Sequence, residues 1–218
     1  MDRFEPDEMP LASRIALAYC AREQRSALGA ALALDRRLSQ LVARTSEPIL
    51  GQMRLAWWRE VLQKEPQSRP QGDAVLDAIS RHWGTKCTAL VALVDGWEYL
   101  LHPEPLDEAA ASAFAAGRAA ALVAACTDEA QDSEPASTAG RVWALADLAA
   151  KVSDPAERMM LVALGRAEAK KRMRLTPQAR AIAVLGALGA RALARGGRPL
   201  MEGRSAAATA IKAAILLR

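Results

Sequence analysis

The stretch Met53-Arg54-Leu55-Ala56-Trp57-Trp58-Arg59-Glu60 places two adjacent tryptophans between two arginines in a segment rich in helix-forming residues. On a helix, Trp57 and Trp58 lie about 100° apart, so both indoles can border one apolar stripe. Arg54 and Arg59 put fixed positive charge beside that stripe. The pattern predicts either a core helix with solvated arginines or a helix that lines an apolar cavity and meets an anion at its rim.

The composition predicts one all-α domain that spans residues 1–218. Alanine, leucine and arginine are abundant, whereas the chain has only two tyrosines and two phenylalanines. Alanine and leucine are among the best helix formers, and runs of β-branched residues are absent. Because a chain of 218 residues can bury a substantial core, we expect closely packed helices and no large sheet.

The positive charge is concentrated in the last quarter of the chain. Residues 166–218 contain twelve Lys or Arg against two Glu, although the net charge of the whole chain is only +4. The asymmetry predicts contact with an anionic partner, or else a solvated face paired with the acidic remainder. The candidate contact with a membrane surface or a membrane-bound protein complex is the cluster Lys170, Lys171, Arg172 and Arg174. The region has no interleaved aromatics, so we expect no nucleic acid partner.

The cysteines and the N-terminus predict a location inside the cell. Cys20, Cys87 and Cys126 are widely spaced and odd in number, which indicates a reducing compartment rather than a disulfide framework. The N-terminus is acidic and lacks a secretory signal, and the apolar runs are interrupted by charges. We expect a cytoplasmic protein without a spanning helix, peripheral to the inner membrane if its basic part contacts lipid.

Caps and apolar periodicity predict about ten helices. Ser46 is expected to cap the third helix, Thr85 the fifth, and Asp154 with Glu157 to form a capping box at the eighth. The acidic stretch 127–138 is expected to be a loop. The expected helices cover about 9–20, 23–43, 46–63, 73–83, 85–101, 106–126, 140–152, a segment from 155, 177–196 and 203–217.

Residue types alone assign no catalytic residue and no metal ligand. Asp73 and Asp77 have the i,i+4 spacing of two carboxylates that share a metal. They also stand where a helix begins, and acids favour the first turn of a helix, which is the interpretation we adopt. His82 and His102 have no ligand partner at a usual spacing. No nucleophile motif and no glycine-rich phosphate loop is present.

Several segments together resemble one family. Residues 53–60 resemble the "RLxWWRxAL" helix of the squalene/phytoene synthase family, whose enzymes join prenyl diphosphates head to head. In the same order, residues 19–42 resemble the helix with the family's first aspartate-rich motif, and residues 93–98 resemble its "LIEGM" segment. Residues 140–148 resemble the helix that leads to the second motif. The resemblance covers residues 10–215 and implies an isoprenoid-synthase-like bundle, shortened relative to the active enzymes.

The two aspartate-rich motifs of this family are incomplete here. In the family, two facing carboxylate clusters hold Mg²⁺ on the substrate diphosphate. At the first position, Asp35 is followed by Arg36 and Arg37; at the second, Asp147 is followed by Lys151 where the family places an aspartate. A cation at a metal site repels the metal. We therefore expect no cofactor, with magnesium required only if the chain is an active enzyme.

Asp95 and Asp147 both fall among apolar neighbours within segments that resemble the family. A buried aspartate needs a cation or several donors, and the candidate partners are Arg54, Arg59 and Arg141. The two aspartates would form internal ion pairs or the polar lining of a central cavity. The candidates for lining a cavity or a ligand site are Asp35, Arg54, Trp57, Trp58, Arg59, Asp95 and Asp147.

Two functions remain open. The loss of acids at both motifs is shared with the respiratory complex I assembly factor of this family. That resemblance implies a non-catalytic pseudoenzyme: an assembly or accessory factor, or an isoprenoid-binding protein, near a membrane. The alternative is a prenyltransferase of isoprenoid or carotenoid biosynthesis that condenses prenyl diphosphates through an unorthodox magnesium site. The missing acids favour the non-catalytic function.

Overall fold

Ten α-helices and four short 3-10 turns make up the regular structure of residues 9–101, 105–127, 130–171 and 173–217, which the computed structural model describes. These residues contain no strand, which confirms the predicted all-α fold of about ten helices. The helices are α1 (Leu11–Tyr19), α2 (Arg25–Arg44), α3 (Pro48–Gln63), α4 (Ala74–His82), α5 (Thr88–Glu98), α6 (Glu108–Cys126), α7 (Ala130–Ala149), α8 (Pro155–Ala169), α9 (Arg180–Ala194) and α10 (Ser205–Leu216).

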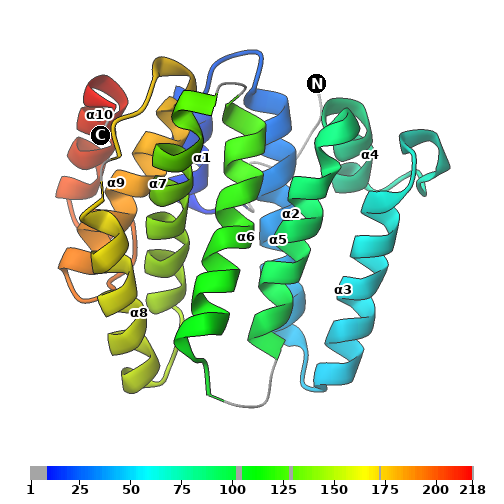
Figure 1. The fold of residues 1–218 in the computed structure, drawn as a ribbon, viewed down its shortest axis with the longest axis horizontal. Helices are drawn as coiled ribbons and strands as arrows, with labels where there is room; N and C mark the ends of the chain where they lie inside the picture. Colours follow the sequence, from blue (N-terminus) through cyan, green and yellow to red (C-terminus); the bar gives the residue numbers. More distant parts are fainter. Residues whose placement is uncertain (1–8, 102–104, 128–129, 172, 218) are drawn as a thin grey trace.

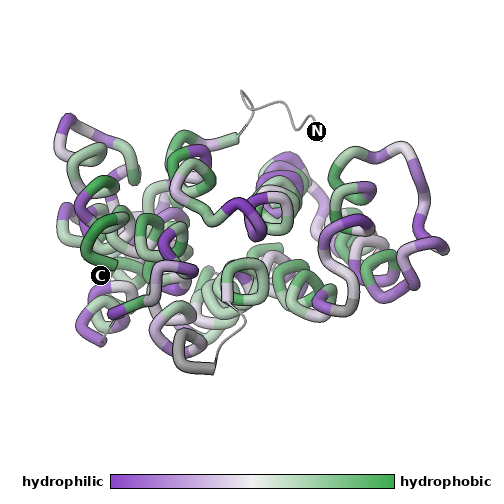
Figure 2. The backbone as a smooth tube through the Cα atoms, turned by 90° about the horizontal axis from the view of Figure 1, so that it is seen from above, coloured by the Kyte–Doolittle hydropathy of each residue, from purple (hydrophilic) through white to green (hydrophobic). Residues whose placement is uncertain are grey.

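Helix α6 runs through the middle of the bundle, between α5 and α7 (Figure 1). Helix α7 also packs against α8 and α9, whereas α2 packs against α4 and α6. At one edge α3 packs against α5, and at the other edge α10 packs against α9 (Figure 1). Figure 2 views the same helices from above, nearly end-on. Helix α6 is long and apolar enough to cross a membrane, contrary to expectation, but more than half of it is buried within the bundle.

Glycine at the contact between α5 and α6 allows the two backbones to approach closely. A Cβ atom on Gly117 would lie 2.2 Å from the carbonyl oxygen of Ala92, closer than atoms can approach. Gly96 lies at the same crossing, where a Cβ would meet the backbone of α6 at 3.1 Å. The close contact holds α6 in the core, and it fixes the position of the next residue in the chain, Arg118.

Two aspartates begin helices as the sequence predicts. The Asp73 carboxylate accepts hydrogen bonds from two backbone N–H groups at the start of α4, both at 3.0 Å. Asp154 does the same at the start of α8, at 2.6 and 3.2 Å. The predicted capping box is wrong in its second half, because Glu157 accepts instead from the backbone N–H of Leu106 at 3.0 Å. Glu157 therefore joins the start of α8 to the segment that precedes α6.

Two predicted helix starts are wrong. Helix α3 begins at Pro48 without a side-chain cap, so Ser46 does not cap it. Proline supplies the start itself, because its fixed φ suits the first position of a helix and its missing N–H would be unpaired there. Helix α5 begins at Thr88 rather than at Thr85, since residues Gly84–Cys87 form a 3-10 turn first.

The acidic stretch 127–138, predicted to be a loop, is largely helical. Helix α7 begins at Ala130 and includes Pro135, which removes one backbone hydrogen bond from the helix. Ala136 and Ala139 are buried in the core, so packing stabilises a segment whose composition alone is typical of a loop. Residues 128 and 129 lie outside the described residues, as does His102.

Candidate functional site

Arg118 lies between the two aspartates that stand at the incomplete motifs. Its Nε and Nη2 donate to Asp35 Oδ1 at 2.8 Å and Oδ2 at 2.6 Å, and its Nη1 donates to Asp147 Oδ2 at 3.0 Å. Asp35 belongs to α2, Arg118 to α6 and Asp147 to α7, so one guanidinium connects three helices. The Arg118 side chain is only 3% exposed. This planar, two-bond contact with Asp35 is the strongest form of arginine–carboxylate pair.

Aromatic rings surround the Arg118 guanidinium. Its Cζ atom lies 3.8 Å from the ring centroid of Trp143, 5.3 Å from that of Phe114 and 5.4 Å from that of Trp97. The indole N–H of Trp97 also donates to Asp35 Oδ1, at 2.9 Å. A guanidinium is weakly hydrated and stacks on aromatic faces, so this environment accepts a buried arginine.

Lys151 adds a second cation to the site. Its Nζ lies 2.8 Å from Asp147 Oδ2, so two carboxylates and two cations balance one another. We call Asp35, Arg118, Asp147 and Lys151 the Arg118 cluster. Burial tends to raise the pKa of Asp147, but Arg118 and Lys151 outweigh it and lower that pKa. Burial likewise tends to lower the pKa of Arg118, and the two aspartates raise it. Asp147 and Arg118 therefore remain ionised at neutral pH.

The donor set of the Arg118 cluster does not fit magnesium. Mg²⁺ requires octahedral oxygen ligands, and three of the four carboxylate oxygens of Asp35 and Asp147 already accept bonds from N–H donors. The cations Arg118 and Lys151 occupy the positions at which a metal would approach those oxygens. Within the described ranges, no group of three or more His, Cys, Asp or Glu residues is placed to hold a metal ion.

Asp95 forms the predicted pair with Arg59, but it is not a buried aspartate. The Arg59 guanidinium contacts Asp95 Oδ1 at 2.6 Å and Glu98 Oε2 at 2.5 Å, and so joins α3 to α5. The Asp95 side chain is 46% exposed. Arg54 is exposed and forms no ion pair with any described residue. Asp95 and Arg59 therefore form a surface pair, separate from the Arg118 cluster.

The two tryptophans of α3 differ in burial. Trp58 lies in the core, whereas Trp57 is 44% exposed and contacts Trp58 edge to face, with centroids 5.1 Å apart. Ile49 and Met53 are exposed on the same side of α3 as Trp57. The burial of Trp58 agrees with the prediction that at least one of the two indoles lies in the interior, whereas Trp57 belongs to the exposed apolar side of α3.

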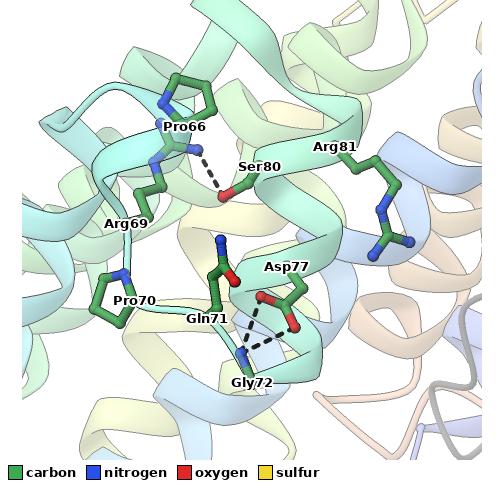
Figure 3. Close-up of a pocket in the computed structure, with 8 residues that line it drawn as sticks. All are labelled: Pro66, Arg69, Pro70, Gln71, Gly72, Asp77, Ser80 and Arg81. Carbon is green, nitrogen blue, oxygen red and sulfur yellow. Dashed lines mark hydrogen bonds between the residues drawn. The ribbon is translucent and has the colours of Figure 1, made fainter.

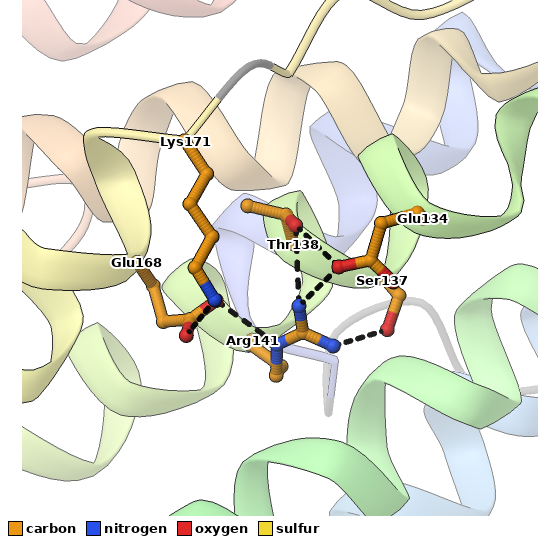
Figure 4. Close-up of polar contacts among 6 residues, drawn as sticks. All are labelled: Glu134, Ser137, Thr138, Arg141, Glu168 and Lys171. Atoms are coloured by element: carbon orange, nitrogen blue, oxygen red, sulfur yellow. Dashed lines mark hydrogen bonds and ion pairs between the residues drawn. The ribbon is translucent and has the colours of Figure 1, made fainter.

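Arg141 pairs with neither Asp95 nor Asp147, contrary to the prediction. It lies six residues before Asp147 on α7, which turns its side chain away from that aspartate. Its guanidinium contacts Glu134, Ser137, Thr138 and Glu168 (Figure 4). Burial tends to raise the pKa of Glu168, but Lys171 and Arg141 lower it. Arg141 therefore holds α7 against α8.

An open pocket of about 460 Å³ lies between helix α4 and the segment that precedes it in the chain, residues 66–72 (Figure 3). Arg69 in its wall is buried, and its N–H groups bond to the carbonyl oxygens of Lys64 and Leu62 and to Ser80 Oγ. The Asp77 carboxylate accepts from the backbone N–H of Gly72. These hydrogen bonds stabilise the turn that precedes α4. Asp77 therefore has a different role from Asp73, which caps α4. The pocket is lined by Pro66, Arg69, Pro70, Gln71, Gly72, Asp77, Ser80 and Arg81.

A family model described as squalene/phytoene synthase matches residues 13–216, nearly the whole chain. The chain therefore belongs to the squalene/phytoene synthase family, as its motifs indicate. No curated protein and no solved structure matches it. Membership in this family makes the Arg118 cluster informative, because Asp35 and Asp147 stand where the resemblance places the two metal-binding motifs.

Arg118, the central residue of the cluster, was not among the residues predicted from the sequence. One local signal was available: Arg118 is the only charged residue of α6 after Glu108, in a segment made almost wholly of alanine and other apolar residues. A charge in such a segment needs a buried counter-ion. Asp35 had no candidate partner, and the partners expected for Asp147 did not include Arg118, because Asp35 lies 83 residues from Arg118 in the chain and Asp147 lies 29 residues from it.

Proposed function

We propose that this protein is a non-catalytic member of the squalene/phytoene synthase family. The observation that carries the proposal is the position of Arg118, whose guanidinium binds both motif aspartates. In this arrangement the aspartates stabilise the fold by joining α2, α6 and α7 and leave no anionic pair for a metal.

The chemistry of the family explains why this arrangement opposes catalysis. A prenyl diphosphate ionises when metal ions stabilise the charge that develops on the departing diphosphate. To admit a metal, this protein would have to break a buried pair, and removing one partner of such a pair costs about 3–5 kcal/mol. The Arg118 cluster is also balanced in charge, so it lacks the negative potential that attracts a divalent cation.

The finer role that we propose is that of an assembly or accessory factor at a membrane. The resemblance to the complex I assembly factor of the family supports this role. The exposed apolar residues Ile49, Met53 and Trp57 on α3 support it as well, because they offer a surface to a partner. Binding of an isoprenoid without turnover is compatible with the same fold.

The test is incubation with farnesyl or geranylgeranyl diphosphate and Mg²⁺, followed by extraction and analysis of hydrocarbon products and of released diphosphate. We expect neither product above a protein-free blank. Turnover that disappears in Asp35→Asn or Asp147→Asn, but persists in the surface control Asp95→Asn, would overturn the proposal and establish the prenyltransferase alternative.

A further inference from the structure

The outer face of α10 is apolar, which is unusual for a helix at the edge of a bundle. Ile215 is 73% exposed, Ile211 is 50% exposed, and Leu216 is exposed as well. With Ala208 and Lys212, these residues line a shallow apolar hollow on the surface. Helix α10 packs only its inner side against α9, at the edge of the molecule (Figure 1).

Helix α10 buries its small side chains and exposes its large apolar ones, the reverse of the usual distribution. The buried inner face consists of the small residues Ala206, Ala210, Ala213 and Ala214, whereas the large apolar residues point outward. Lys212 is the only charged residue between Ser205 and Leu216. A surface helix normally carries polar residues on its outer face, so the exposed isoleucines indicate an apolar partner.

Cations border this apolar face at both ends. The backbone N–H of Leu175 donates to the carbonyl oxygen of Leu217 at 2.9 Å, which places the preceding basic segment beside the C-terminal end of α10. Lys170 and Arg174 in that segment are exposed. Arg204 precedes the other end of the helix and is exposed too.

The cations around α10 are not neutralised by the protein itself. Among the described residues, Lys170, Arg174, Arg204 and Lys212 form no ion pair, and all four are exposed. The two acids of this region are already engaged: Glu168 pairs with Arg141 and Lys171, and Glu202 pairs with Arg195 and Arg198. Of the predicted contact residues, Lys171 is therefore ion-paired, and Arg172 lies outside the described residues.

We propose that the outer face of α10 docks onto an anionic lipid bilayer. In this arrangement Ile211, Ile215 and Leu216 enter the boundary between head groups and acyl chains. The four free cations meet lipid phosphates around them. Apolar insertion and phosphate attraction are each weak alone and bind stably together, which is the combination that this face offers. The inference is independent of whether the protein is an enzyme, because α10 lies apart from the Arg118 cluster.

Co-sedimentation of the full chain with vesicles of phosphatidylcholine, alone or mixed with phosphatidylglycerol, tests the docking surface. We expect binding only to the mixed vesicles, and less binding as salt is added. The double variant Ile211→Gln/Ile215→Gln should lower the partition coefficient by about tenfold or more. The variant Lys170→Gln/Arg174→Gln/Lys212→Gln should lower it by a similar factor. The matched control Leu11→Gln/Tyr99→Gln removes two exposed apolar side chains to which no binding role is assigned and should bind like the unaltered protein.

A fluorescence measurement locates the contact with a smaller change to the protein. An environment-sensitive dye on Ile215→Cys labels one exposed thiol, because Cys20, Cys87 and Cys126 are buried. Its emission should shift to the blue with mixed vesicles, and the same dye on Leu11→Cys, another exposed position, should not respond. Three results would overturn the proposal: equal binding to vesicles of phosphatidylcholine without phosphatidylglycerol, no binding to either kind of vesicle, or undiminished binding by Ile211→Gln/Ile215→Gln.

Discussion

Replacement of Arg118 by methionine is expected to be among the most destabilising substitutions in this protein. The change retains much of the side-chain volume but removes the three N–H donors that bind Asp35 and Asp147 at 2.6–3.0 Å. Loss of one partner from a buried ion pair typically costs about 3–5 kcal/mol. Trp97 still donates to Asp35 and Lys151 still pairs with Asp147, so we expect the lower end, about 3 kcal/mol. For a chain of this length, that free energy corresponds to a fall of about 6–12 °C in Tm.

The cost of Arg118→Met should depend on pH in a specific direction. In the unaltered protein the pKa of Asp147 is lowered. Its contribution to stability is therefore complete above the unfolded pKa of about 4 and is lost only as the pH falls further, through the folded pKa. Without Arg118, only Lys151 remains to oppose the effect of burial on Asp147, so the pKa of that carboxyl should rise, and its protonation in mild acid relieves a charge that has lost one of its two cations. The deficit of the variant should be largest at pH 7 and should shrink as the pH approaches about 4.

Urea unfolding followed by circular dichroism at pH 7 and pH 5 measures this deficit. The matched control is Arg59→Met, which removes another arginine with two carboxylate partners, all three of them partly exposed, whereas Arg118 is buried. Exposed pairs contribute about 0–1 kcal/mol, so the control should lose little stability. Equal costs for Arg118→Met and Arg59→Met, or a deficit that does not change with pH, would refute the role assigned to Arg118.

Three further substitutions test the packing and the helix starts. Trp58→Ala should cost about 3–5 kcal/mol because the indole is buried, whereas the exposed Trp57→Ala should cost less than half as much; equal losses of Tm would contradict the burial. Gly117→Ala should lower Tm markedly, since the added Cβ would overlap a carbonyl oxygen of α5. The control Gly29→Ala should change Tm little or raise it, because the atom nearest to its added Cβ lies 3.9 Å away. Asp154→Ala should cost about 1 kcal/mol of unfolding free energy, through loss of the α8 cap, and an unchanged urea midpoint would show that the cap is dispensable.

The helices could be predicted from the sequence because their signals are local. Alanine-rich composition, apolar spacing and caps such as Asp73 and Asp154 lie within one or two turns of the structure that they specify. The start of α7 could not be predicted in this way. Its first residues are acidic and include Pro135, and they form a helix because Ala136 and Ala139 bury against neighbouring helices. Tertiary packing overrides local composition there.

The candidate site could be predicted only in part, because its partners are distant in the chain. The aspartates Asp35 and Asp147 were identified through the family motifs, and so was the cation Lys151. Arg118 connects residues 83 and 29 positions away, and no local pattern specifies such a pairing. Arg59, in contrast, was named correctly as a partner of Asp95, since the two neighbouring helices α3 and α5 present both residues at their contact.

We propose that Arg118 occupies the place of a metal ion between Asp35 and Asp147. A crystal structure of the protein soaked with Mg²⁺ and a non-hydrolysable thio analogue of farnesyl diphosphate tests it most directly. We expect the Arg118 guanidinium to remain bound to Asp35 and Asp147 and neither carboxylate to carry a metal ion. A magnesium ion coordinated by Asp35 or Asp147, with Arg118 displaced toward the diphosphate, would contradict it.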